Sequence, residues 1–157
     1  YWETNKIEVQ LNFMLTHGYD FSYTTYQVIN SDGKIVDKIK ARKKLEYNEL
    51  LKSCDIGLSS VILKRKLLND MKFPELKTKE DFVLWLSLAK RSVNLFGLDD
   101  PLMFWRKIPN SLSDSILQKL KDAFKVYYVY ERKNFFYSIY YVIRLSIYAL
   151  IKKINLH

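Results

Sequence analysis

The sequence is 157 residues long, enough for one domain with a core, and its 48% hydrophobic and 27% charged residues exclude a disordered chain. Lys and Arg number 26 against 17 Asp and Glu, a net charge of +9, and residues 118–157 carry eight basic and two acidic residues, or +6 of that total. The single cysteine, Cys54, excludes a disulfide within the chain and fits a reducing compartment.

The first 70 residues alternate between helical and extended patterns. Apolar residues recur at helical spacing from Ile7 to Leu15, which predicts a helix over 4–16 that packs on this face and ends at Gly18. A hairpin is expected next, because two runs rich in aromatic and β-branched residues flank a turn, Asn-Ser-Asp-Gly-Lys. A short helix, a buried strand or strand–loop, and a second short helix follow. The expected ranges, in chain order, are 19–30, 35–40, 46–53, 56–64 and 65–70.

A helix, two strands and two long helices are expected in the second half. Pro74 breaks the chain, and Thr78 is a good N-cap for an amphipathic helix. The two strands are expected to join at an Asp-Asp-Pro turn, and Ser111 or Ser113 is expected to cap the first long helix. The expected ranges are 79–90, 93–98, 102–107, 110–133 and 134–154.

This order of elements predicts an α/β fold, or α+β for an isolated fragment, with a mixed sheet and packed helices. We assign residues 1–113 to this part and residues 114–157 to a helical, basic and aromatic extension.

Glu80 and Asp81 open the helix after Thr78, and two interpretations fit them. Asp81 can hydrogen-bond back to the cap and complement the helix dipole, which is the commoner role. A carboxylate there can also act as a general base if burial or an approaching substrate raises its basicity. Other catalytic signatures are absent from the sequence, since it has no glycine-rich phosphate loop and two histidines are too few for a zinc site.

Two motifs, in order, carry a resemblance to a known family. They are FPELKTKEDFVLWL (73–86) and LDDPLMFWRKIPNSLS (98–113), and GLSSVILKRKLL (57–68) is a third similar stretch. Together they resemble the second half of a glycosyltransferase family 2 enzyme. This family has the GT-A fold and often builds bacterial surface polysaccharides. The resemblance covers the chain up to about Ser113.

The opening YWETNKIEVQLNFML is similar to the stretch that follows the metal-binding D-x-D-D motif in that family. The resemblance implies that the chain begins just past this motif and lacks the nucleotide-binding half. A divalent metal, Mg or Mn, is then expected in the full-length enzyme, with no metal site in this piece. We expect the piece alone to be inactive.

The resemblance implies inverting transfer of a sugar from a nucleotide-sugar donor to a hydroxyl of a growing bacterial surface polysaccharide or glycolipid. By its match to the E-D motif, Asp81 is the expected general base. Glu80 is expected to support Asp81 or to contact the acceptor. Donor sugar, nucleotide, acceptor and linkage are not specified by the sequence.

Four further residues are substrate-binding candidates, each with a structural alternative. Trp85 either packs in the core behind the site or stacks on a sugar. Arg106 either reaches the diphosphate or the acceptor, or is a surface arginine. Ser59 and Ser60 either line the cleft or are satisfied by the backbone.

The segment 134–153 combines basic and aromatic residues. Arg144 lies at the centre of its apolar stretch, at a cost of about 2.5–3.5 kcal/mol in a membrane span, so we do not expect a span. The helix is expected either to lie in a membrane interface or to pack on the domain or in a homo-oligomer. We expect a cytoplasmic protein, peripheral on the inner face of the cell membrane.

The alternative to an enzyme is a non-catalytic basic and aromatic module that binds a membrane surface. Nucleic acid is not expected as a partner, because the sequence has no recognition motif and its basic residues alternate with large apolar ones.

Overall fold

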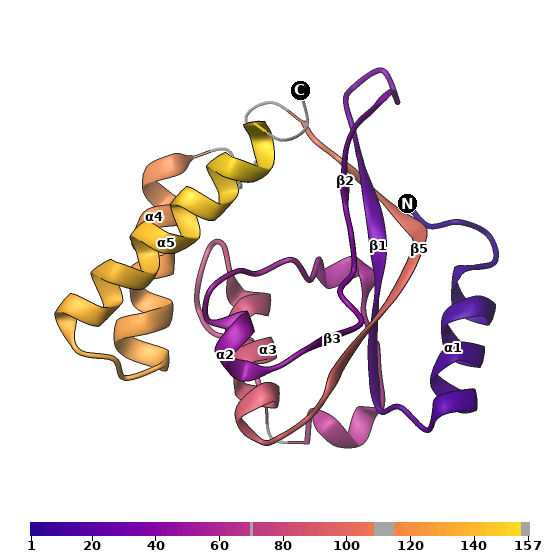
Figure 1. The fold of residues 1–157 in the computed structure, drawn as a ribbon, viewed down its shortest axis with the longest axis horizontal. Coiled ribbons are helices and arrows are strands. Elements are labelled where there is room, and N and C mark those ends of the chain that lie inside the picture. The colour runs from indigo at the N-terminus through magenta and orange to yellow at the C-terminus, as the bar shows by residue number, and fades with distance from the viewer. Residues whose placement is uncertain (70, 109–114, 155–157) are drawn as a thin grey trace.

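A computed structural model describes residues 1–69, 71–108 and 115–154, with the backbone alone at 152–154. A mixed sheet lies between helix α1 on one side and helices α2 and α3 on the other, and α4 and α5 form a hairpin beyond them (Figure 1). The elements are α1 (Lys6–His17), β1 (Phe21–Ile29), β2 (Ile35–Ile39), β3 (Lys44–Leu45), α2 (Tyr47–Leu50), η1 (Leu58–Ser60), β4 (Ile62–Leu63), η2 (Arg65–Leu67), α3 (Glu80–Lys90), β5 (Leu95–Arg106), α4 (Ile116–Lys125), the π-helical turn η3 (Val126–Tyr130) and α5 (Phe135–Ile154).

Strand β1 is the centre of the sheet. It pairs in parallel with β5, antiparallel with β2 and, at Phe21–Ser22, antiparallel with β4. Strand β5 also pairs antiparallel with β3, and Trp2 forms an antiparallel bridge to Met103. The predicted α/β fold with a mixed sheet and packed helices is confirmed, as is the β1–β2 hairpin.

The two strands predicted at 93–98 and 102–107 are one strand, β5. Leu98 lies opposite Thr24 and Pro101 lies opposite Thr25, so Asp99 and Asp100 form a bulge instead of a turn. The Thr25 hydroxyl donates to Asp99 Oδ1 at 2.7 Å, which holds the bulge against β1. The prediction of a turn was wrong because a bulge also accommodates a proline, which has no N–H to give to the sheet.

Of the two alternatives predicted for 56–64, the strand–loop fits and the buried strand does not. This segment consists of the 3-10 turn η1 and the two-residue strand β4. The helix predicted at 65–70 is reduced to the single turn η2.

Helix α1 buries a different face from the predicted one. The apolar side chains of Ile7 and Leu15 are 47% and 65% exposed, while Lys6 and Gln10 are fully buried. The Gln10 amide donates to Ser22 Oγ at 2.9 Å, and Lys6 Nζ donates to Gln10 Oε1 at 2.7 Å. The sheet presents the polar side chain of Ser22 to this helix, so Lys6 and Gln10 pack there together with Met14, while Ile7 and Leu15 stay outside.

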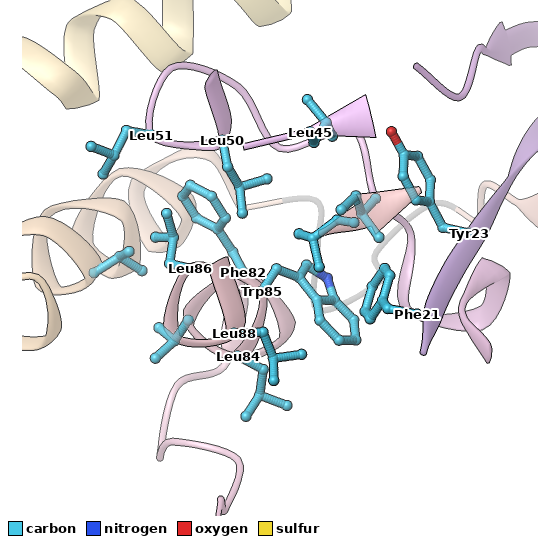
Figure 2. Close-up of a cluster of buried hydrophobic side chains, with 14 of the residues drawn as sticks. Phe21, Tyr23, Leu45, Leu50, Leu51, Phe82, Leu84, Trp85, Leu86 and Leu88 are labelled. Atoms are coloured by element: carbon cyan, nitrogen blue, oxygen red, sulfur yellow. The ribbon is translucent and has the colours of Figure 1, made fainter. Parts of the chain in front are cut away.

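The main core lies on the opposite face of the sheet, around α3. Side chains from α3 meet the aromatic rings of β1 and the leucines of β3 and α2 (Figure 2). The Trp85 ring is 1% exposed and packs edge-on to Phe21 at a centroid distance of 5.3 Å. Each such fully buried side chain contributes about 1.5–3 kcal/mol to stability.

The C-terminal helices begin later than predicted. Helix α4 starts at Ile116, where Ser115 Oγ accepts from the N–H of Gln118 at 3.3 Å. The predicted caps Ser111 and Ser113 lie outside the described residues. The predicted second helix is confirmed as α5.

Side chains of α4, η3 and α5 contact the rest of the chain. Val126 and Tyr127 are fully buried in the main core, and the Tyr127 hydroxyl donates to the carbonyl of Leu51 at 2.9 Å. Further along, the Tyr148 hydroxyl accepts from Arg42 Nη2 at 2.7 Å. One face of α5 is thereby fixed to the domain. Among the described residues, no helix combines the length and apolar character needed to cross a membrane.

Candidate active site

A cavity of about 570 Å³ opens where the start of α3 meets the sheet. Its walls come from four places in the chain: Tyr26 of β1, residues 57–59 around η1, residues 77–81 at the start of α3, and Met103 with Trp105 of β5. Three of these segments fall within the stretches that carry the family resemblance.

Asp81 lies in this cavity near the N-terminus of α3, together with Glu80. Asp81 Oδ1 accepts from the N–H of Phe82 at 2.8 Å, which fixes the orientation of the carboxylate. The pKa of Asp81 is raised to about 6, first by burial and second by the negative charge of Glu80. The Phe82 N–H and the positive charge of Lys79 lower it by a smaller amount. A carboxylate with this pKa is ionised at neutral pH and accepts a proton more readily than an ordinary aspartate.

The predicted capping box at Thr78 is wrong. Thr78 donates both its N–H and its hydroxyl to Asp122 Oδ2 of α4, at 3.0 and 2.9 Å. The residue before the helix is Lys79, in the left-handed conformation at φ 66°, and it makes no side-chain cap. Asp81 therefore does not close back on Thr78, and its carboxylate is presented to the cavity.

Asp122, which lies 44 residues after Thr78 in the chain, anchors the loop that precedes α3. Its side chain is 1% exposed and also accepts from Gln118 Nε2 at 2.9 Å. Burial opposes ionisation of Asp122, but the hydrogen bonds from Gln118 and Thr78 outweigh it and lower the pKa. The ionised Asp122 thus fixes the backbone that leads into Glu80 and Asp81.

The other predicted site residues divide between the cavity and the rest of the molecule. Glu80 and Ser59 line the cavity. Ser60 is fully buried and its hydroxyl donates to the carbonyl of Gly57, so its structural alternative fits its position. Trp85 lies in the core and not in the cavity wall, so the structure does not bring its ring to a sugar.

Arg106 is exposed at the end of β5 and is not part of the cavity wall, whereas its neighbour Trp105 is. Side chains alternate between the two faces of a strand, so Met103 and Trp105 share a face that Arg106 does not. This alternation was the signal that could have selected Trp105 from the sequence. Its ring is 44% exposed and offers an apolar surface in the cavity wall.

Tyr26, Lys77 and Lys79 also line the cavity and were not predicted. Burial raises the pKa of Tyr26 above its usual range, so its hydroxyl stays protonated. The two lysines add positive charge beside the two carboxylates. In the described parts of the chain, no three His, Cys, Asp or Glu side chains group as a metal site would require. The adjacent Glu80 and Asp81 are thus an incomplete donor set for a metal ion.

Sequence comparison finds relatives of this chain among curated proteins. No family model matches the sequence. WfgD of Escherichia coli is 37% identical over 126 residues, which cover 80% of this chain and 49% of that protein. WfgD is named as a UDP-Glc:α-D-GlcNAc-diphosphoundecaprenol β-1,3-glucosyltransferase, and WfaP, with the same name, is 37% identical over 76% of this chain and 47% of its own length.

TuaG of Bacillus subtilis (strain 168) is 33% identical over 135 residues, covering 85% of this chain and 54% of its own length. It is provisionally named as a teichuronic acid biosynthesis glycosyltransferase. The chain thus spans about half the length of the curated relatives it matches. Over most of its own length, the chain is homologous to bacterial glycosyltransferases.

Proposed function

We propose that the protein containing this chain is an inverting glycosyltransferase of family 2 and that the chain forms the acceptor side of its GT-A domain. The substrate classes are a nucleotide sugar and a hydroxyl of a lipid-linked or polysaccharide glycan. The observation that carries the proposal is the half-buried, oriented carboxylate of Asp81 in a cavity that Trp105 also lines. The names of the homologues, which include two glucosyltransferases with a lipid-linked acceptor, support it.

The chemistry assigned to this chain is removal of one proton. As the acceptor oxygen attacks the anomeric carbon, its proton passes to Asp81, and the bond from that carbon to the nucleotide diphosphate breaks. Attack from the face opposite the leaving group inverts the configuration. Glu80 keeps Asp81 basic by repulsion, since its charge is one cause of the raised pKa.

Binding of the substrates is assigned to the cavity walls. Trp105 supplies a flat apolar surface suited to one face of a sugar ring. Lys77 and Lys79 supply positive charge suited to a phosphate. A divalent metal, Mg or Mn, remains part of the proposal for the full-length protein, where it would neutralise the departing diphosphate.

The configuration of the product tests the proposed function. The full-length protein would be incubated with UDP-glucose, the donor in the names of two relatives, and with a synthetic GlcNAc-diphosphate lipid. We expect a β-linked product from the α-linked donor, seen in the anomeric proton coupling by NMR. An α-linked product would contradict the inverting mechanism. Absence of transfer from a panel of nucleotide sugars would contradict the function.

A second property rests on a different observation, the outer face of α5. Phe136 and Tyr137 are 80% and 60% exposed there, and Ile143 is 53% exposed near Arg144. We propose that this face contacts an anionic membrane from the cytoplasmic side, with aromatic rings in the interface and basic groups at the phosphates. Such contact would bring the cavity to a lipid-linked acceptor.

A further inference from the structure

A second concave surface, the α4–α5 groove, has a volume of about 350 Å³. Its walls are mainly apolar side chains from the facing sides of the two helices: Ile116, Leu120 and Ala123 of α4, and Leu145, Ala149 and Leu150 of α5. Ile116 is 71% exposed and Leu150 is 58% exposed. Apolar side chains gathered in a concave exposed surface typically mark a binding site.

The α4–α5 groove and the candidate active site share one residue, Lys79. Lys79 is held beside both by the anchoring of Thr78 to Asp122 of α4. A single molecule could therefore extend from the cavity into the groove past Lys79. Its polar part would lie in the cavity and its apolar part in the groove. The positive charge of Lys79 suits an anion at that junction.

We propose that the α4–α5 groove binds the hydrocarbon chain of the lipid-linked acceptor, next to its phosphates, and that Lys79 contacts those phosphates. This inference rests on the proposed function, because it concerns the same acceptor whose sugar hydroxyl is deprotonated by Asp81. Binding of the chain in the groove would orient the acceptor sugar in the cavity and favour lipid-linked acceptors over soluble ones.

Charge argues against a second copy of the chain as the occupant. A symmetric dimer through this face would bring Lys79 of one copy toward Lys79 of the other. Like charges at such an interface are unfavourable. An amphiphile with a phosphate beside its hydrocarbon chain meets the apolar walls and Lys79 together.

The test compares two acceptors with the same sugar diphosphate, one on a long isoprenoid chain and one on a short, water-soluble alkyl chain. Ala149→Trp in the full-length protein fills the groove, and Leu120→Asn reduces its apolar surface. Leu117→Trp is the matched control, because Leu117 is 80% exposed on the same helix and does not line the groove. Thermal melting checks that each variant folds.

We expect Ala149→Trp and Leu120→Asn to raise KM for the long-chain acceptor about tenfold, or 1.4 kcal/mol, and to leave KM for the short-chain acceptor and kcat unchanged. Leu117→Trp should change neither. An unchanged KM for the long-chain acceptor, or an equal rise for both acceptors, would overturn the inference. So would a change confined to the oligomeric state.

The role of Lys79 is tested by Lys79→Gly, because glycine adopts φ 66° without strain and the substitution removes only the side chain. We expect weaker binding of farnesyl diphosphate, measured by calorimetry, with Ala149→Trp weakening it as well. This binding assay also separates the two proposals. Loss of transfer with intact, groove-dependent binding would refute the proposed function alone, while binding that ignores both substitutions would refute the groove.

Discussion

At the scale of single residues, the site depends on a carboxylate that the fold makes more basic. Asp81 is half-buried beside Glu80, and its partial burial and the charge of Glu80 raise its pKa to about 6. The hydrogen bond from the Phe82 N–H orients Asp81 without cancelling this effect. The family resemblance of the sequence identified Glu80 and Asp81 as candidates. Their burial depends on how the rest of the chain packs around the start of α3, so the raised pKa could not be predicted from the sequence.

The pH dependence of transfer should report the pKa of Asp81. Activity, measured as kcat/KM, should fall as the pH drops through about 6, because the protonated carboxyl cannot accept the acceptor's proton. Glu80→Gln removes a negative charge that raises this pKa, so the acid limb should move to lower pH. Glu75→Gln, at an exposed position outside the cavity, is the control. An acid limb that stays in place or moves to higher pH in Glu80→Gln would contradict this role.

The same pKa predicts a gain in stability for Asp81→Asn. The folded pKa of Asp81 lies above its unfolded value, so folding becomes less favourable as the pH rises from about 4 to 6 and the carboxylate must ionise in place. Asparagine does not ionise, so the variant should gain about 1–3 kcal/mol in the free energy of unfolding at pH 8 and little at pH 4. Urea denaturation at both pH values measures this.

Asp20→Asn is the control of opposite sign, because ion pairs with Lys64 and Lys66 lower the pKa of the partly exposed Asp20. It should not gain stability at pH 8. An Asp81→Asn variant no more stable than the wild type at pH 8 would show that the carboxylate is not strained by burial.

At the scale of elements, the start of α3 is set by α4. The prediction of a Thr78 cap failed because local spacing contains no information about a partner 44 residues away. Strand alternation similarly separates Trp105 from Arg106 once β5 is known to be continuous. The hairpin and the helix 79–90 were predictable because their patterns are local.

Asp122→Ala should destabilise the protein and the site together. It leaves the buried N–H and hydroxyl of Thr78 without their acceptor, at a cost of about 1–3 kcal/mol for each unsatisfied group. We expect a lower free energy of unfolding in urea and a lower kcat, since the loop leading to Asp81 loses its anchor. Asp122→Asn, whose carbonyl oxygen can still accept, should recover part of both. Lys121→Ala, at an exposed neighbouring position, is the control, and wild-type stability of Asp122→Ala would contradict the anchoring role.

At the scale of the whole molecule, the C-terminal helices connect the cavity to a second, apolar surface. Tyr127 is buried in the main core, and Glu131 accepts from Lys90 at 2.8 Å and from Tyr47. These contacts fix η3 to the domain. Tyr141 of α5 stacks on Tyr127 and Tyr148 accepts from Arg42, so this face of α5 packs inward and the face with Phe136 and Tyr137 stays outside. The basic and aromatic composition of this extension was evident in the sequence, but which face packs inward was not.

Membrane binding through this outer face can be measured with anionic vesicles. The double substitution Phe136→Ser and Ile143→Ser should weaken binding of the full-length protein to phosphatidylglycerol vesicles severalfold, with binding weaker at high salt. Ile7→Ser with Leu15→Ser is the control, because these side chains form an exposed apolar face on α1 away from the extension. Equal binding by the wild type and the α5 variant would contradict the proposed contact.

The kcat of Asp81→Asn in the full-length protein is the most direct test of the central claim, that Asp81 is the general base. Asparagine keeps the size and the acceptor oxygen of Asp81 but cannot take a proton. We predict that kcat for sugar transfer falls by about 100- to 10,000-fold, while the affinity for the nucleotide sugar, measured by calorimetry, is unchanged. A variant that keeps a wild-type kcat would contradict the claim and leave the carboxylate with a structural role alone.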